Sequence, residues 1–264
     1  MDDSNFTTCR SPVEFASDNL DDGNHIFKIE AEDNVGNVNP SPASFSWNVD
    51  TAAPTTIIKH AMDGNRSTIT NGSNTRSSFV IFEFAGNDTG TGINHFECSI
   101  DNSNFTSCTS PVQSNKLAEG YHSVKIRSQD GVGNTDDSPA SFGWTVDTVA
   151  PTTSINKAIV GDEISLTNGS NSKFNSITFT FTGNDTGGLG IREFECSLDD
   201  SNFTACTSPV QYNSTIITDG PHDFKVFSKD NVGNNDLTPA KFTWNVDTIA
   251  PITNITKIVD GNIL

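Results

Sequence analysis

The chain carries the stretch FECSLDDSNFTACTSP at residues 194–209 and nearly the same stretch, FECSIDNSNFTSCTSP, at residues 96–111. A shortened version, MDDSNFTTCRSP, begins at Met1. Each version is followed by a Gly-x-His triplet, a D-x-V-G-N cluster and a closing W-x-V-D-T-x-A-P segment. A sequence that repeats itself at a fixed period predicts an array of small domains rather than one large domain.

Three tryptophans mark the period, because Trp47, Trp144 and Trp244 lie roughly 100 residues apart, which is the length of one independent domain. We expect a partial repeat at 1–50, complete repeats at 51–147 and 148–247, and the first strand of a further repeat at 248–264. The incomplete repeats at both ends favour a stretch of a longer covalent array. The alternative is donor-strand polymerisation, in which a neighbouring copy accepts the residues Ile252, Ile255, Ile258 and Val259.

The hydrophobic pattern predicts short β-strands. Ile177, Phe179 and Phe181 alternate with polar residues, and Phe224 and Val226 do the same further along the chain. This period of two indicates strands with one buried and one wet face. Several such strands, separated by turn residues about every dozen positions, predict an all-β fold of tandem β-sandwich domains.

The motifs F-E-C-S-x-D, C-T-S-P-V, G-x-H, D-x-V-G-N and W-x-V-D-T-x-A-P resemble the Ig-like, fibronectin-III-like repeats of large bacterial and archaeal cell-surface proteins. The resemblance implies an elongated array of Ig-like sandwiches that serves as an extracellular fibre, stalk or filament, with neighbouring repeats or further copies as its partners. It leaves open an adhesin that binds glycans or the proteins of a host or neighbouring cell. It also leaves open a spacer or carbohydrate-binding domain of a secreted enzyme.

The charge and the motifs exclude several function classes. The formal net charge is −18, so Lys and Arg are too few for nucleic acid to be an expected partner. No stretch is long and apolar enough to predict a membrane span. There is no G-x-S-x-G motif and no recurring pair of carboxylates with an acid–base partner, so we expect neither an enzyme nor an organic cofactor. The histidines His25, His122 and His222 occur once per repeat and are expected to begin strands.

The cysteines predict one disulfide in each complete repeat. Cys98 and Cys108 lie ten residues apart, and so do Cys196 and Cys206. Paired cysteines in small domains are typical of an oxidising compartment, which indicates an extracellular location. Two cysteines per domain cannot complete a four-cysteine metal site.

Recurring acidic residues are candidate Ca²⁺ ligands. One set ends a strand on its inward-pointing side, and the other set closes each repeat. Ca²⁺ takes about six to eight oxygen ligands, and the resemblance implies Ca²⁺ sites at domain junctions. The alternative is that these residues only form Asx-turns. The candidate ligands are Asp33, Asp130 and Asp230 in the first set, and Asp50, Asp147 and Asp247 in the second.

The chain is also rich in N-x-S/T sequons, where an attached glycan would be bulky and solvating. A composition rich in Asn, Ser and Thr creates such motifs by chance, so both interpretations stay open. The sequon asparagines are Asn5, Asn65, Asn71, Asn87, Asn104, Asn168, Asn184, Asn202, Asn213 and Asn254.

Overall fold

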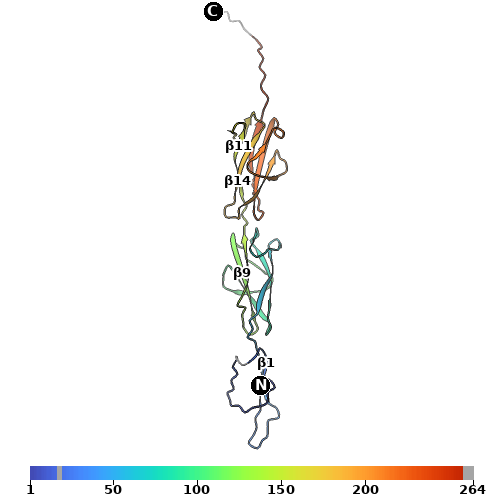
Figure 1. The fold of residues 1–264 in the computed structure, drawn as a ribbon, viewed down its shortest axis with the longest axis vertical. Coiled ribbons are helices and arrows are strands. Elements are labelled where there is room, and N and C mark those ends of the chain that lie inside the picture. The colour runs from blue at the N-terminus through green and yellow to red at the C-terminus, as the bar shows by residue number, and fades with distance from the viewer. Residues whose placement is uncertain (17–19, 258–264) are drawn as a thin grey trace, which may run out of the picture. The chain divides into compact units, whose positions relative to one another are not determined.

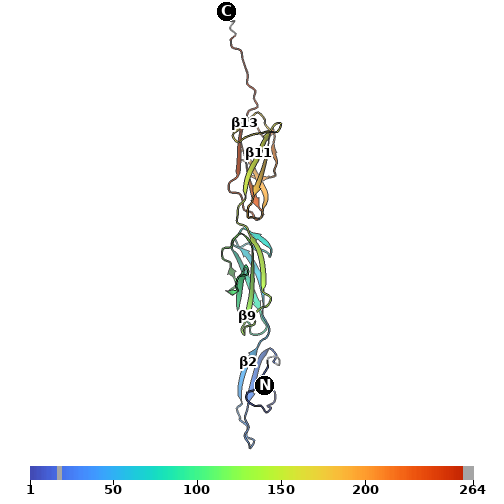
Figure 2. The same ribbon diagram turned by 90° about the vertical axis from the view of Figure 1, so that its left-hand side faces the viewer.

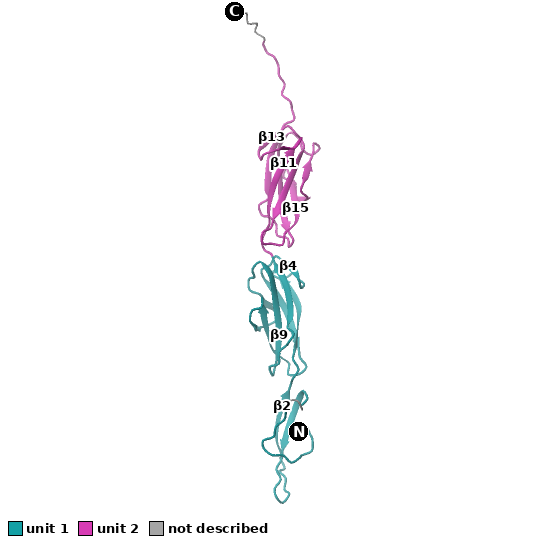
Figure 3. Ribbon diagram, turned by 60° about the vertical axis from the view of Figure 1, so that its left-hand side comes forward, with its two compact units in different colours: residues 1–146 teal, residues 147–264 magenta. Residues whose placement is uncertain are grey.

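The computed structural model describes residues 1–16 and 20–257, and every regular element in them is a β-strand (Figure 1). The chain divides into two compact units, residues 1–146 and residues 147–264 (Figure 3). Unit 1 contains both the predicted partial repeat and the first predicted complete repeat. Unit 2 contains the second complete repeat. The all-β fold with sandwich domains is therefore as the sequence predicts.

The sandwich of unit 1 has a three-stranded sheet, in the order β3-β5-β8, and a five-stranded sheet, in the order β4-β10-β9-β6-β7. All neighbours are antiparallel except β4, which pairs in parallel with β10. The strands are β3 (Thr55–Asp63), β4 (Ser73–Thr75), β5 (Val80–Asn87), β6 (Ile93–Ile100), β7 (Thr106–Cys108), β8 (Val112–Gln113), β9 (Gly120–Asp130) and β10 (Ala140–Val146).

The sandwich of unit 2 repeats this arrangement, with sheets in the orders β12-β11-β14-β17 and β13-β19-β18-β15-β16. Its additional short strand, β12, pairs with the end of β11. The strands are β11 (Thr152–Val160), β12 (Ile164–Ser165), β13 (Ser170–Ser172), β14 (Ile177–Asn184), β15 (Ile191–Leu198), β16 (Thr204–Cys206), β17 (Val210–Tyr212), β18 (Gly220–Asp230) and β19 (Ala240–Val246).

Each core lies between the two sheets of one sandwich (Figure 2). Every second residue of β9 and of β18 is buried, from the histidine near the start of the strand to the aspartate that ends it. The ring of Phe179 stacks on Phe224 at a centroid distance of 4.1 Å, and Trp144 is fully buried in the other core. The alternation read from the sequence is thus the alternation of the folded strands.

Residues 1–50 form one hairpin, β1 (Gly23–Ile29) paired with β2 (Ala43–Val49). Among the described residues of this part, no second sheet covers the hairpin. Phe45 is therefore 68% exposed, whereas its equivalent Phe242 is 7% exposed in a complete sandwich. Phe15 packs beside Trp47 at 6.0 Å and covers part of the same face.

The strand expected at 248–264 does not form over residues 248–257, and residues 258–264, including Ile258 and Val259, lie outside the described residues. The equivalent segments β3 and β11 are strands because β5 and β14 supply their hydrogen-bonding partners. Among the described residues, nothing pairs with 248–257, and Ile252 and Ile255 are exposed. An extended segment without a paired neighbour is not a sheet strand.

The disulfides join the cysteines that the spacing predicts, Cys98 to Cys108 and Cys196 to Cys206. Each one ties a long strand to the short strand paired with it, β6 to β7 and β15 to β16. Cys9 is exposed and unbonded. Within the described residues, no helix is long and apolar enough to cross a membrane.

Candidate metal centre

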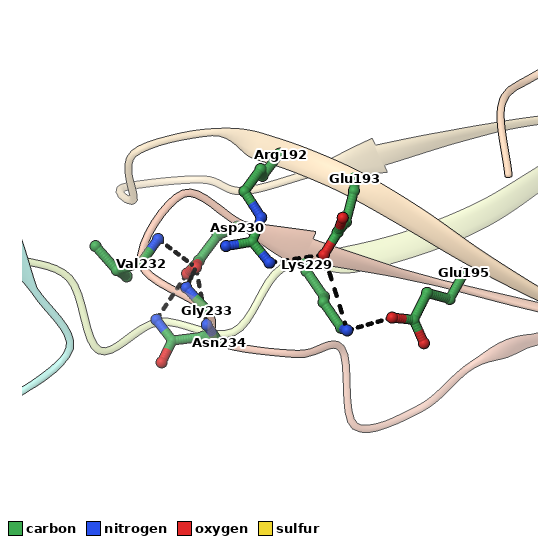
Figure 4. Close-up of polar contacts among 8 residues, drawn as sticks. All are labelled: Arg192, Glu193, Glu195, Lys229, Asp230, Val232, Gly233 and Asn234. Atoms are coloured by element: carbon green, nitrogen blue, oxygen red, sulfur yellow. Dashed lines mark hydrogen bonds and ion pairs between the residues drawn. The ribbon is translucent and has the colours of Figure 1, made fainter. Parts of the chain in front are cut away.

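The aspartates that end β9 and β18 fold the following D-x-V-G-N turn around themselves. Asp230 Oδ1 accepts hydrogen bonds from the backbone N–H groups of residues 232, 233 and 234, at 2.6–2.9 Å. The side-chain amide of Asn234 donates to Asp230 Oδ2 at 2.7 Å (Figure 4). Asp130 and Asn134 repeat these contacts. Both aspartates are fully buried, because strand parity points them inward.

The neighbouring pairs in Figure 4 are a separate feature of the sheet surface. Lys229 Nζ contacts Glu195 and lies 3.8 Å from Glu193, whose carboxylate also accepts from Arg192 at 2.6 Å. These ion pairs are partly exposed, and exposed pairs contribute only about 0–1 kcal/mol to stability.

The same turn holds the segment that enters each sandwich. Asn134 Nδ2 donates to the carbonyl oxygens of Asp50 at 2.9 Å and Ala52 at 3.4 Å. In unit 2, Asn234 Nδ2 donates to the corresponding carbonyls of residues 147 and 149, at 3.0 and 3.3 Å. The asparagine of the D-x-V-G-N motif therefore anchors the main chain of the V-D-T-x-A-P motif. Both motifs were evident in the sequence, but the contact between them was not.

A third loop completes the site. One carboxylate oxygen each from Asp50, Asp88 and Asp130 lies within 4.8 Å of the other two, and Asp147, Asp185 and Asp230 form the same group in unit 2. Asp88 and Asp185 sit in the G-N-D-T-G loops that follow β5 and β14. These six residues are the two acidic clusters, one in each unit.

Each cluster contains one buried carboxylate oxygen that lacks a hydrogen-bond partner among the described residues. Asp88 Oδ1 and Asp185 Oδ1 are shielded from solvent and have no hydrogen-bond partner among the described residues. A buried polar atom without a partner costs roughly 1–3 kcal/mol, and more when it is charged. Carboxylate and carbonyl oxygens are the ligands that Ca²⁺ prefers, so the donor set of each cluster fits a hard divalent cation.

The two clusters differ in their electrostatics. Hydrogen bonds from the hydroxyl and the N–H of Thr91 hold the pKa of the Asp50 carboxyl below its usual value. Burial raises the pKa of Asp147, and the charges of Asp230 and Asp185 raise it further, against the effect of the N–H donors of residues 189 and 149. Without a cation, the ionised form of Asp147 is therefore less stable relative to its protonated form than it would be in an exposed carboxyl.

Four of the six predicted ligands are thus brought together, as Asp50 with Asp130 and Asp147 with Asp230. Asp33 is exposed, and its carboxylate accepts hydrogen bonds from residues 35 and 37 of its own turn. Asp247 is exposed, and its Oδ1 accepts from the N–H of Ile249. Sequence reasoning missed Asp88 and Asp185. Their signal was the recurring G-N-D-T-G loop, which is glycine-rich but matches no known binding motif.

All ten sequon asparagines are exposed. The side chains of two of them already serve the fold, because Asn71 Oδ1 accepts from the N–H of Gly143 and Asn168 Oδ1 accepts from that of Thr243, both at 2.7 Å. Exposure is a requirement for glycosylation and says nothing about occupancy. Glycan attachment stays a prediction.

No protein-family model matches the chain, and no curated protein matches it. The fibronectin(III)-like modules of Clostridium thermocellum CbhA align with 77% of this chain and all of their own, at 14% identity and a TM-score of 0.39. A Ca²⁺-stabilized adhesin that helps an Antarctic bacterium bind ice aligns with 85% of this chain, at 18% identity and a TM-score of 0.38. The tetra-tandem repeat in the extending region of a large adhesion protein aligns with 87%, at 17% identity and a TM-score of 0.29.

These neighbours are fibronectin(III)-like modules and tandem repeats of adhesins, the kinds of domain that the repeat motifs resemble. The chain spans 57% and 58% of the lengths of the two adhesion proteins. At these identities and TM-scores the neighbours carry no information about the function of this chain. The functional proposal below is based on the repeats and on the two clusters.

Proposed function

We propose that the chain is part of an extracellular array of Ig-like sandwiches that acts as a structural fibre, stalk or filament, and that Ca²⁺ fixes each entering segment to its sandwich. The observation that supports this most directly is the repeated anchor. In both units an asparagine side chain donates to main-chain carbonyls of the segment that precedes the first strand, and three carboxylates cluster at the same place. Because the same anchor recurs in both units, we infer that each anchor fixes the segment that leads into its own sandwich.

The disulfides and the acidic surface suit this role. One disulfide per sandwich supports an oxidising, extracellular setting. A formal charge of −18 keeps an array soluble and draws cations towards it. Adhesion through the loops stays a prediction, since no described surface favours a particular glycan or protein.

Ca²⁺ in each cluster would be held by the three carboxylates. The oxygens of Asp88 and Asp185 that lack a hydrogen-bond partner would then serve as ligands, which removes the free-energy penalty of leaving them unsatisfied. A ligand that binds only the folded state stabilises it by mass action, by about 2.7 kcal/mol at a concentration 100 times its Kd. We expect the Tm of the full chain to rise from EDTA to millimolar Ca²⁺. We also expect backbone amides 51–52 and 148–149 to exchange more slowly.

The matched variants are Asp88→Asn and Asp185→Asn, which replace the carboxylate that has the unbonded oxygen. Each should abolish the Ca²⁺ effect in its own unit and leave the other unit responsive. Asp137→Asn, at an exposed position outside the clusters, is the control. An equal Tm in EDTA and Ca²⁺ would remove the cation from the proposal. Small-angle scattering tests the array itself, and a particle as compact as a single globule would contradict it.

A further inference from the structure

A histidine, an aspartate and a tryptophan recur together outside the acidic clusters. Near the start of β9, His122 lies 2.7 Å from Asp101, and in β18 His222 lies 2.8 Å from Asp199. The rings lie near Trp144 and Trp244, with centroids 5.9 and 5.2 Å away. The hairpin of residues 1–50 has the same trio, His25, Asp2 and Trp47.

Each of these histidines contacts two acceptors. The Nε2 atom of His122 lies 2.9 Å from the carbonyl oxygen of Ala118, which can only accept, so Nε2 carries a hydrogen. The Nδ1 atom faces Asp101 Oδ2, while Asp101 Oδ1 accepts from the N–H of Ser123 at 2.9 Å. An ionised carboxylate also only accepts, so Nδ1 carries a hydrogen too. A ring with hydrogens on both nitrogens is an imidazolium.

In unit 2 the same reasoning applies. His222 Nε2 lies 2.7 Å from the carbonyl oxygen of Thr218, and Asp199 Oδ1 accepts from the N–H of Asp223 at 2.9 Å. Both rings are nearly buried, with His122 7% and His222 8% exposed. A buried charge persists in a folded protein only when it is paired, and here its partner is the aspartate.

The aspartate is the first of two consecutive turn residues with positive φ. Asp101 and Asn102, between β6 and β7, have φ values of 52° and 58°, and Asp199 and Asp200 have 50° and 57°. Most side chains disfavour this left-handed region, and Asp and Asn are among the few residues other than glycine that adopt it in turns. The imidazolium and the following N–H each hold one carboxylate oxygen of the first turn residue.

We propose that these histidines form a pH-sensitive lock, in which each imidazolium holds the turn between β6 and β7, or between β15 and β16, and releases it as the pH rises. Deprotonation leaves one hydrogen for two acceptors. The ring then loses either the bond to the aspartate or the bond to the carbonyl. The turn that it supports also carries the start of the disulfide-bonded strand, so the loss loosens that edge of the sandwich.

The surrounding charges agree with this direction. In unit 2 the charged groups around His222 come from the turn, from β18 itself and from β19, and they are Asp199, Asp200, Asp223, Lys225 and Lys241. Around His122 they are Asp101 on the turn, Glu119 before the strand and Lys125 on β9, whose ammonium donates to Asn102. β10 contributes no charged side chain.

Burial lowers the pKa of both histidines, but their hydrogen bonds to the aspartate and the carbonyl outweigh it, so each pKa lies above the usual 6.5. A raised pKa in the folded state means stability that is complete below the ordinary pKa and is lost as the pH rises through the raised one. The lock therefore holds below the ordinary histidine pKa and opens as the pH rises through the raised pKa.

The test is a pH titration of the full chain with ¹⁵N-labelled histidine. We expect both ring nitrogens of His122 and His222 to be protonated below the ordinary histidine pKa of 6.5, and both residues to lose a proton only at a higher pH. After correction for intrinsic exchange, the amide of Ser123 should exchange up to about tenfold faster per pH unit while the lock opens.

The double variant Asp101→Asn and Asp199→Asn removes the ion pair. Asparagine keeps one acceptor oxygen for the two donors, so one hydrogen bond is lost as well, the histidine pKa should fall and its pH dependence should flatten. His60→Gln is the control and should change neither. A neutral ring below pH 6.5, a histidine pKa at or below that ordinary value, or unchanged pH dependence in the double variant would overturn the proposal.

Discussion

The acidic clusters of the two sandwiches share their carboxylates and their anchoring asparagine but differ in one loop residue. In unit 1 the residue before the glycine that ends the loop is Thr91, whose hydroxyl donates to Asp50 at 2.7 Å. In unit 2 the equivalent residue is Leu189, which offers only its N–H, at 2.8 Å from Asp147. The unit 2 loop also has one more glycine, Gly188.

The pKa shifts of Asp50 and Asp147 have opposite directions, so their effects on the pH dependence of stability are also opposite. A carboxyl whose folded pKa is lowered, as at Asp50, adds stability above its ordinary pKa and loses it as the pH falls. A carboxyl whose folded pKa is raised, as at Asp147, reduces stability once it is ionised, and this cost disappears as the pH falls. The duplicated sites thus keep their geometry, while the deeper burial of Asp147 and the hydroxyl of Thr91 beside Asp50 shift the two pKa values in opposite directions.

The largest expected effect tests what the sandwiches share. Replacing both cysteines of one disulfide, as Cys98→Ser with Cys108→Ser, should destabilise that sandwich by about 3 kcal/mol, because the unfolded chain gains freedom. The corresponding change at Cys196 and Cys206 should cost the same. Hydrogen exchange of β9 and β18 in the full chain measures each sandwich separately. Cys9→Ser, at an unbonded exposed thiol, is the control.

Unequal losses in that experiment would show that the sandwiches differ in more than their clusters. The comparison of Asp50 with Asp147 would then need correction for the different background stability of the two units.

The next effect tests the anchor that both clusters contain. Asn134→Ala and Asn234→Ala each remove the donor that holds two carbonyl oxygens and one carboxylate. Leaving such groups unsatisfied should cost about 1–3 kcal/mol in either unit. Asn37→Ala is the matched control, because within the described part of the chain Asn37 Nδ2 donates to Asp33 and to no entering segment. A control loss as large as the others would assign the effect to the turn and not to the anchor.

The sequence predicted the strands because their pattern is local. Alternation along β18 identifies the buried face, and the recurring Gly-x-His triplet identifies the strand start, where Gly120 and Gly220 have positive φ. The disulfides were predictable because a spacing of ten residues repeats. Each of these signals can be read within one strand or between two strands that follow each other in the chain.

The cluster was predicted only in part because its members come from distant segments. Asp130 was identified by its parity at the end of a strand, and Asp50 by its place at the end of a repeat. Asp88 lies in a loop that sequence reasoning took as a plain connection, and only the folded sandwich brings it to the other two. Asp33 and Asp247 have the same local sequence, but within residues 1–16 and 20–257 neither is grouped with two further carboxylates.

A smaller effect, of opposite sign in the two units, follows from the titrations. Without a divalent cation, Asp147→Asn should stabilise unit 2, because it removes a charge that burial disfavours and that lies near Asp230 and Asp185. Asp50→Asn should destabilise unit 1, because it removes a carboxylate that three donors favour. Urea unfolding in EDTA, followed by hydrogen exchange, measures the change in the free energy of unfolding of each unit. Two variants that shift stability in the same direction would refute the electrostatic difference.

The smallest effect isolates the hydroxyl itself. Thr91→Val keeps the shape and the N–H donor but removes the hydrogen bond from Oγ1 to Asp50, so the Asp50 pKa should rise towards that of Asp147. Leu189→Thr should lower the Asp147 pKa, because it adds a hydroxyl to the residue whose N–H already donates to Asp147. Carboxyl ¹³C titration in the full chain measures both values. Thr89→Val, at an exposed position in the same loop, is the control. If Thr91→Val leaves the Asp50 pKa unchanged, the difference between the clusters comes from the deeper burial of Asp147, which is 1% exposed against 8% for Asp50.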